Sequence, residues 1–235
     1  VIPKILAIAV VLFGMLAAST LAAIATQALK GYFDFEFGKY FAWYVLPQTV
    51  TVVLFAVLSL FMQTLVPQKA FGWMLMLLFV VGLMTLGRLG FEHNLYQYAG
   101  NPGTPLSDMN GQGDLGRFAW WFRGYWTAAA LVLAVLAYAL WRRGAGAPLR
   151  TRLARLPGRL AGAPGGIAAA GLLVMLTLGG WIFYNTNVIN EYRTALDVER
   201  ETAETERALI GYEAVPQPRI TDVQLDVALY PVEPR

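Results

Sequence analysis

A short stretch near the middle of the chain holds the residue types that most often do chemistry. Glu92, His93 and Asn94 are consecutive, and Asp108 and Asn110 follow within a segment rich in glycine and proline. A zinc site needs three or four well-placed ligands, and His93 is the only histidine, so no metal site is expected here. The five residues remain candidates for a functional loop. The alternative is an ordered cap, in which Asp108 and Asn110 bond local backbone as turn residues do.

Other catalytic chemistry finds little support in the sequence. The absence of cysteine excludes a thiolate zinc site and a cysteine nucleophile. No glycine-rich phosphate loop, nucleophile elbow or His-Glu-x-x-His pattern occurs, so we expect no enzyme, metal or cofactor within this segment. An intramembrane enzyme would need polar groups at membrane depth, and such groups would serve equally well as hydrogen-bonding contacts between helices. The candidates are Gln48, Thr49, Thr51, Gln63, Thr85 and Thr177.

A second candidate site is a basic segment without acidic residues. Leucines at 149, 153, 156 and 160 share roughly one helical face, which predicts a short amphipathic helix interrupted near Pro157. Its cations would face anionic lipid headgroups. Nucleic acid is not an expected partner, since headgroups explain a basic patch at a membrane. The cations are Arg142, Arg143, Arg150, Arg152, Arg155 and Arg159.

Long uncharged runs dictate how these candidates are positioned. The chain is 57% hydrophobic and only 14% charged, whereas soluble domains carry about a quarter charged residues. A helix needs about 20 apolar residues to cross a bilayer, and in lipid the backbone must bond to itself. We therefore predict an all-α membrane protein with a bundle of about five transmembrane helices. The uncharged runs are 5–29, 40–68, 70–87, 124–141 and 160–190.

The basic segment also predicts the orientation of the bundle. Positive residues gather on the cytoplasmic side of membrane proteins, so residues 142–159 are expected in the cytoplasm. Alternation then places residues 30–40, the long loop 88–123 and everything after Asn190 outside. Aromatic residues near the ends of the runs, such as Trp73, Trp141 and Trp181, agree with these boundaries. Pro47 is expected to kink the second span or to delay its start.

The character of the chain changes after the fifth span. Residues 191–217 begin with a charged stretch that predicts a solvated helix and end among prolines that stop it. Within residues 218–235, the apolar residues Val223, Leu225, Val227 and Leu229 alternate with Gln224, Asp226 and Ala228, which indicates a half-buried strand. One strand cannot bury its face alone, so this one would begin a β-domain of a longer protein. The sequence therefore predicts three parts: the membrane bundle of residues 1–190, the polar helix and linker of residues 191–217, and the start of a β-domain in residues 218–235.

Four motifs carry a resemblance to a known family. They are Gly90–Leu95 (GFEHNL), Ser107–Gly111 (SDMNG), Tyr184–Tyr192 (YNTNVINEY) and Pro218–Val223 (PRITDV). In this order they resemble the membrane region of large bacterial fusion proteins. In those proteins a permease of the type-2 ABC exporter class precedes a zinc aminopeptidase domain of the aminopeptidase N type. The resemblance covers nearly the whole chain and transfers no catalytic residue to it.

The resemblance implies partners and cofactors outside this segment. ATP would bind to a separate ABC ATPase subunit on the cytoplasmic side, which the basic segment of residues 142–159 would face. Zinc would bind to the peptidase domain downstream. The protein would lie in the bacterial inner membrane, with its C-terminal side extracytoplasmic. A homodimer is a further arrangement to be tested. The competing hypothesis is a simple polytopic anchor that holds the peptidase at the membrane without transporting anything.

Overall fold

The computed structural model describes residues 2–105, 107, 109, 111–141, 148–216 and 219–228. It divides into a compact unit of residues 1–194 and a second unit of residues 195–235. Five helices are long and apolar enough to cross a membrane, which confirms the predicted fold class. No strand forms among the described residues, where Ser107 and Gly111 make an isolated bridge.

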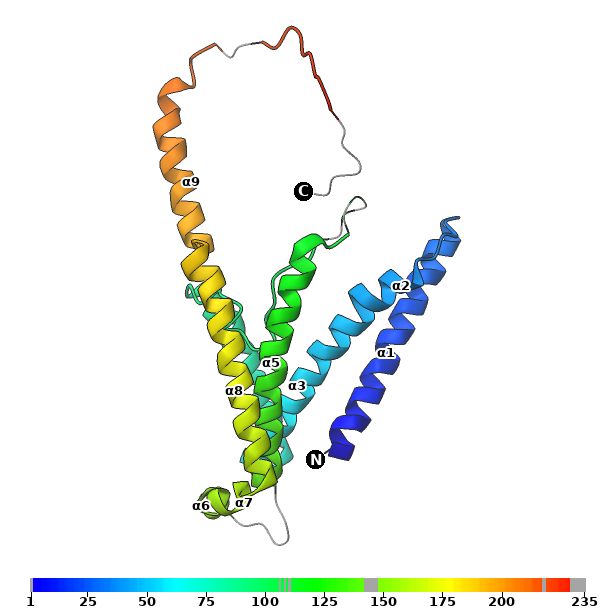
Figure 1. The fold of residues 1–235 in the computed structure, drawn as a ribbon, viewed down its shortest axis with the longest axis vertical. Coiled ribbons are helices and arrows are strands. Elements are labelled where there is room, and N and C mark those ends of the chain that lie inside the picture. Colours follow the sequence, from blue (N-terminus) through cyan, green and yellow to red (C-terminus); the bar gives the residue numbers. More distant parts are fainter. Residues whose placement is uncertain are drawn as a thin grey trace. The chain divides into compact units, whose positions relative to one another are not determined.

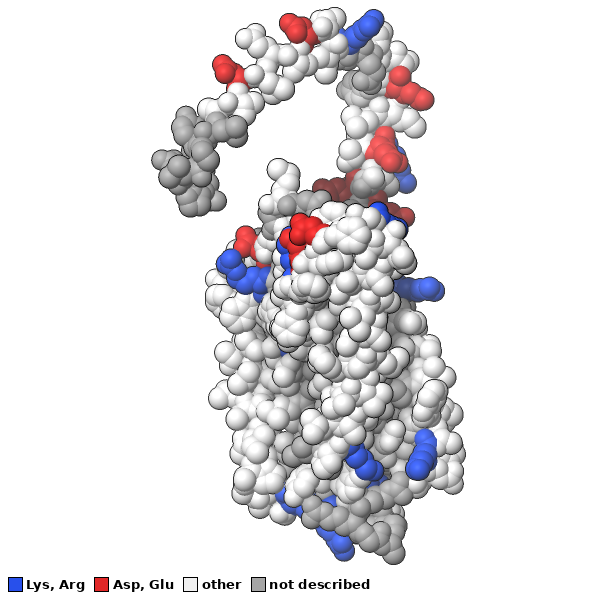
Figure 2. All heavy atoms as spheres, turned by 90° about the vertical axis from the view of Figure 1, so that its right-hand side faces the viewer, with Lys and Arg blue, Asp and Glu red and all other residues white. Residues whose placement is uncertain are grey.

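The first unit is a bundle in which α5 is central (Figure 1). Helix α5 packs against α3 on one side and α8 on the other, while α3 also packs against α1 and α4. The face drawn in Figure 2 shows a broad band without charged side chains between the two ends of the bundle. The spanning helices are α1 (Ile2–Leu29), α3 (Leu46–Leu65), α4 (Lys69–Arg88), α5 (Gly113–Leu140) and α8 (Ala163–Phe183).

The two ends of the bundle are built differently. At the arginine end, where α3 and α5 finish, the short helices α6 (Leu149–Ala154) and α7 (Leu156–Leu160) form an elbow before α8. At the loop end, residues 89–112 connect α4 to α5. The expected loop 88–123 was wrong in its second part, because residues 113–123 are already helical. Asp114 in the first turn of α5 favours this early start, since it interacts well with the helix dipole and pairs with Arg117.

Pro47 does not delay the start of the second span. A continuous helix runs from α2 (Phe37–Lys39) through a π-helical segment, η1 (Tyr40–Val45), into α3, and Pro47 lies in the first turn of α3. Proline has no N–H, and its ring clashes with the carbonyl four residues earlier in a regular helix. The wider turn of η1 directly before it relieves that conflict. A second π-helical segment, η2 (Tyr184–Ile189), extends α8.

The second unit contains the expected polar helix, α9 (Ala195–Leu209), followed by a 3₁₀ turn (Ile210–Tyr212). All described residues of the second unit except Ala203 are exposed, as expected of a solvated helix. The described residues 219–228 have no regular secondary structure, so the predicted strand is not formed there. Residues 229–235 lie outside the described residues. Because a strand needs a partner to bond its backbone, the strand expected within residues 218–235 stays a prediction.

Candidate functional site

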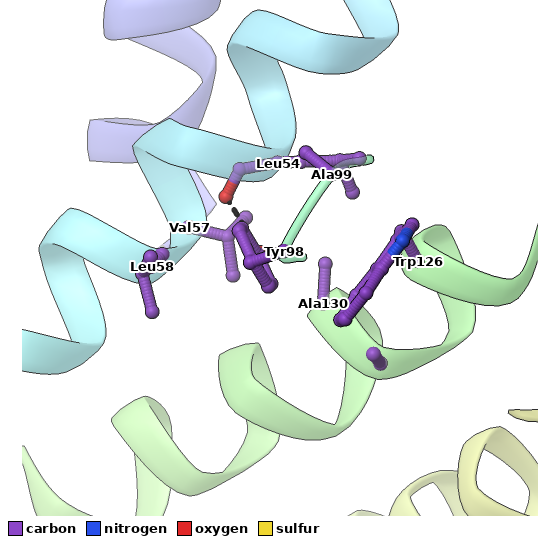
Figure 3. Close-up of a cluster of buried hydrophobic side chains, with 8 residues drawn as sticks. Leu54, Val57, Leu58, Tyr98, Ala99, Trp126 and Ala130 are labelled. Carbon is purple, nitrogen blue, oxygen red and sulfur yellow. Dashed lines mark hydrogen bonds between the residues drawn. The ribbon is translucent and has the colours of Figure 1, made fainter. Parts of the chain in front are cut away.

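The loop of residues 89–112 enters the bundle instead of lying over it. Tyr98 and Ala99 are each only 8% exposed, and the Tyr98 hydroxyl donates a 2.8 Å hydrogen bond to the carbonyl oxygen of Leu54 (Figure 3). Leu54 is in the middle of α3. Irregular backbone beside the middle of a membrane span is tolerated only where protein buries it. The loop is buried in this way at Tyr98, whose ring lies against the rings of Phe55, Phe79 and Trp126.

Two further bonds attach the loop to α5. The indole Nε1 of Trp126 donates to the backbone oxygen of Asn94 at 3.2 Å. The Arg123 guanidinium donates to Asn101 Oδ1 at 3.3 Å and lies 5.1 Å from the centre of the Trp120 ring. Each of these side chains reaches from a spanning helix to the loop. The loop is therefore held to α5 at two levels as well as to α3.

His93 joins the loop to the π-helical end of α8 and has one proton arrangement. The Leu95 N–H donates to Nδ1 at 3.1 Å, so Nδ1 must carry the lone pair. Nε2 then carries the proton and donates to Thr186 Oγ1 at 3.0 Å. The Thr186 hydroxyl donates in turn to the Ile182 carbonyl at 2.8 Å. His93 is 5% exposed, and this series of hydrogen bonds gives both ring nitrogens of the neutral histidine a partner.

Burial governs the electrostatics around His93. Desolvation lowers the pKa of His93 below its ordinary value of 6.5, which favours the neutral ring that the hydrogen bonds require. The His93 ring lies 4.7 Å from the Tyr192 ring, measured between centroids. Burial and then the charges of Glu92 and Tyr96 raise the pKa of Tyr192. Tyr192 is thus in ring contact with His93 and also within electrostatic reach of the Glu92 carboxylate.

A cavity of about 380 Å³ lies beside His93, between α5, η2 and the loop. Its walls are mainly apolar, and its polar groups come from the loop, from η2 and from the residues that follow η2. The lining residues are His93, Asn94, Pro102, Leu115, Phe118, Trp121, Phe122, Trp181, Ile182, Asn185, Thr186, Asn190, Glu191, Tyr192 and Arg193. This volume falls within the range of roughly 300–1,000 Å³ typical of small-molecule pockets.

A second cavity, of about 500 Å³, lies between α1 and η1. Tyr40 donates from its hydroxyl to Gln27 Oε1 at 2.5 Å, and Tyr44 shares a 2.9 Å hydrogen bond with Ser19. At its mouth Lys39 pairs with Glu36 at 2.5 Å. Both cavities are lined by a π-helical segment, a feature frequent at functional sites. Six of the polar residues that line this second cavity are thus paired with one another.

At the arginine end, Arg152 differs from the expectation of an outward-facing basic segment. It is 4% exposed, and its Nη1 donates to the carbonyl oxygens of Thr64 at 2.5 Å and Leu140 at 2.9 Å. Those carbonyls belong to the last turns of α3 and α5, where the helix has no partners of its own for them. Arg152 therefore caps two spanning helices at once, and its positive charge suits their C-terminal dipoles.

The remaining arginines divide between capping and exposure. Arg159 is half-buried and donates to the carbonyl oxygens of Ala139 at 2.6 Å and Trp141 at 3.4 Å. Arg150 and Arg155 are exposed, as the sequence led us to expect. Arg142 and Arg143 lie outside the described residues. The elbow thus presents cations outward while two arginines fix it to the helix ends.

The predicted loop residues are only partly brought together. Glu92, His93 and Asn94 lie beside the 380 Å³ cavity or line it, whereas Asp108 and Asn110 lie outside the described residues. In the described part of the chain, no three His, Asp or Glu residues gather in a way that suits a metal ion. The hydroxyls of Thr49, Thr51, Thr85 and Thr177 each donate to the carbonyl four residues earlier in their own continuous helix, so these bonds do not link one helix to another.

Sequence reasoning missed the residues that hold this site together. Tyr98, Trp126 and Thr186 act through contacts with distant segments, and their spacing along the chain gives no sign of these contacts. One available signal was the concentration of aromatic residues between 91 and 98 and between 118 and 126, which exceeds what two interfacial belts require.

Together the fold and the site define a multi-pass α-helical membrane protein with a loop inserted among its spans. No known protein family, no curated protein and no solved structure matches the chain.

Proposed function

We propose that this chain is the permease-like membrane part of an ABC-type transporter. The observation that carries the proposal is the elbow of α6 and α7, which Arg152 and Arg159 tie to the ends of α3 and α5. The elbow also continues directly into α8. A simple anchor needs no such connection, since one span suffices to hold a domain at a membrane.

The elbow offers a mechanical route from a partner to the cavity. A force applied to α6 and α7 acts on α3 and α5 through hydrogen bonds and on α8 through the chain. Helices α5 and α8 line the 380 Å³ cavity at the loop end of the bundle. A displacement at the arginine end would thus change the spacing of the cavity walls, because a packed helix transmits motion along its length.

ATP hydrolysis would belong to a separate cytoplasmic subunit. The sequence contains no phosphate loop of the Walker type, which fits such a division of labour. The exposed cations Arg150 and Arg155 suit an acidic surface on that subunit or the anionic headgroups beside it. In this arrangement the arginine end faces the cytoplasm of a bacterial cell and α9 lies outside the inner membrane.

We also propose that the chain is fused to an extracytoplasmic zinc aminopeptidase-like domain. The four motifs quoted above and the alternating pattern of residues 218–235 support this proposal. Zinc would be held by that downstream domain. Sequencing the native reading frame tests the fusion: a His-Glu-x-x-His motif with a later glutamate is expected beyond Arg235, and a stop codon shortly after Arg235 would rule it out.

Purification of the native protein from its own membranes tests the transporter proposal. We expect an ATPase subunit to copurify and to be identified by mass spectrometry. Substituting the exposed cations, in the double variant Arg150→Glu with Arg155→Glu, should release that subunit while the melting temperature stays unchanged. Retention of a stable, ATPase-free protein in every preparation would instead favour the membrane anchor.

A further inference from the structure

The 380 Å³ cavity has an apolar lining that two spanning helices, α5 and α8, contribute. Phe122 and Ile182 are buried at 6% and 3% exposure. Trp121 on α5 and Trp181 on α8 face each other, with ring centroids 6.4 Å apart, yet they remain 43% and 53% exposed. Tryptophan favours the membrane interface because its ring is apolar and its N–H is polar. This pair therefore places one side of the cavity at the level where acyl chains meet headgroups.

The mouth of the same cavity carries opposite charges. Glu191 and Arg193 both line it, and an Arg193 Nη2 to Glu191 Oε2 distance of 3.3 Å joins them. Their side chains are 81% and 47% exposed. An ion pair this exposed contributes little by itself, so a ligand that carries both charges can replace it at small cost. Glu92 lies close enough to Tyr192, which also lines the cavity, for its charge to help raise the pKa of Tyr192.

We infer that this cavity binds a phospholipid with a phosphoethanolamine headgroup. One acyl chain lies along Phe118, Trp121 and Trp181. The primary ammonium of the headgroup donates to the Glu191 carboxylate, and the phosphate accepts from the Arg193 guanidinium. Both of these hydrogen bonds are charge-assisted. The ammonium and the phosphate are each opposite in charge to the residue they would contact at the mouth.

The same chemistry discriminates against other lipids. A choline headgroup has no N–H and cannot donate to Glu191. A phosphoglycerol headgroup carries a phosphate but no cation, so it can pair with Arg193 but leaves the carboxylate of Glu191 without a positive partner. His93 does not offer the phosphate a donor, because its Nε2 proton already bonds Thr186. The inference goes beyond the proposed function and holds equally for a transporter and for an anchor.

Native mass spectrometry of the detergent-purified full chain tests this inference. Phosphatidylethanolamine, phosphatidylcholine and phosphatidylglycerol with identical acyl chains are added separately at matched low ratios. We expect the first to bind about threefold to tenfold more tightly than the other two, as one or two partly exposed charge-assisted hydrogen bonds allow. Glu191→Gln should bring phosphatidylethanolamine down to the level of phosphatidylcholine, and Arg193→Gln should weaken both of these lipids.

Two controls separate the site from general lipid binding. Leu115→Trp fills the cavity from α5 and should abolish the preference, whereas Glu199→Gln with Arg200→Gln changes matching charges on α9 and should leave it intact. Soluble glycerophosphoethanolamine at the same concentrations should not compete, because it lacks the acyl chain. Equal binding of the three lipids, or a preference that survives both Glu191→Gln and Leu115→Trp, would overturn the inference and show annular lipid only. Competition by the soluble headgroup would show that the site recognises the headgroup alone, and would overturn the inference that a lipid is the ligand.

Discussion

Arg152 and Thr64 are 88 residues apart, and a 2.5 Å hydrogen bond joins the guanidinium of the first to the carbonyl oxygen of the second. Thr64 is near the end of α3, and the same Nη1 atom also reaches Leu140 at the end of α5. One buried side chain thus satisfies the terminal carbonyls of two spans. This makes the elbow part of the bundle rather than an attachment to its surface.

Replacing Arg152 should weaken the whole bundle. Arg152→Ala removes two hydrogen bonds from a charged donor and leaves buried carbonyls unsatisfied, which should lower the free energy of unfolding by about 2–4 kcal/mol. Thermal unfolding in detergent measures the effect as a lower melting temperature. The matched control is Arg150→Ala, an exposed position where a change within about 0.5 kcal/mol is expected. Equal effects of the two variants would contradict the capping role.

The buried hydroxyl of Tyr98 allows a narrower test of the inserted loop. Tyr98→Phe keeps the ring against Phe55 and Trp126 but removes the bond to Leu54, which should lower the free energy of unfolding by about 1 kcal/mol. Tyr98→Ala also empties the aromatic cluster and should cost about 3–5 kcal/mol. The exposed Tyr96 provides the control, since Tyr96→Phe should change little. Comparable melting temperatures for Tyr98→Ala and wild type would show that the loop does not enter the bundle.

His93 should make the stability of the bundle depend on pH. Its pKa is lowered in the folded state, so between that lowered value and about 6.5 the unfolded chain binds more protons than the folded one. The stabilisation is complete above 6.5 and is lost as the pH falls through this window. Melting temperatures from pH 7.5 to 5 should therefore fall more steeply for wild type than for His93→Gln, which keeps a donor toward Thr186 but does not titrate. Parallel curves would exclude this role of His93.

The orientation can be measured directly because the chain has no cysteine of its own. Single cysteines at the exposed positions Ala154 and Thr205 leave every charged residue in place. A membrane-impermeant maleimide applied to intact cells stripped of their outer membrane should label Thr205→Cys and spare Ala154→Cys until the membrane is opened. The reverse pattern would place the arginine end outside and remove the site proposed for a cytoplasmic ATPase.

The spans were predictable from sequence because a bilayer imposes a simple rule of length and charge. The same rule misplaced the start of α5, since Arg117 and Arg123 interrupt the uncharged run although the helix begins at Gly113. Arg123 is accommodated inside the helix because it bonds Asn101 in the inserted loop and stacks on Trp120. Charge alone could not reveal those partners.

The candidate site was predictable only in outline. The loop around His93 and the basic elbow both proved to lie at structured positions, but their roles depend on long-range contacts. Arg152 is buried while Arg150 and Arg155 are exposed, although all three belong to one basic segment. Likewise, the neutral state of His93 follows from Leu95 and Thr186 together, and Thr186 is 93 residues away.

ATP hydrolysis by the purified native complex, reconstituted in lipid nanodiscs, tests the transporter proposal most directly. We expect steady ATP hydrolysis from the wild-type complex. The rate should be lost from the double variant Arg150→Glu with Arg155→Glu, while the control Glu199→Gln with Arg200→Gln keeps it. A native preparation that hydrolyses no ATP, or a rate that the double variant leaves unchanged, would contradict the proposal that a partner ATPase acts on the bundle through the elbow.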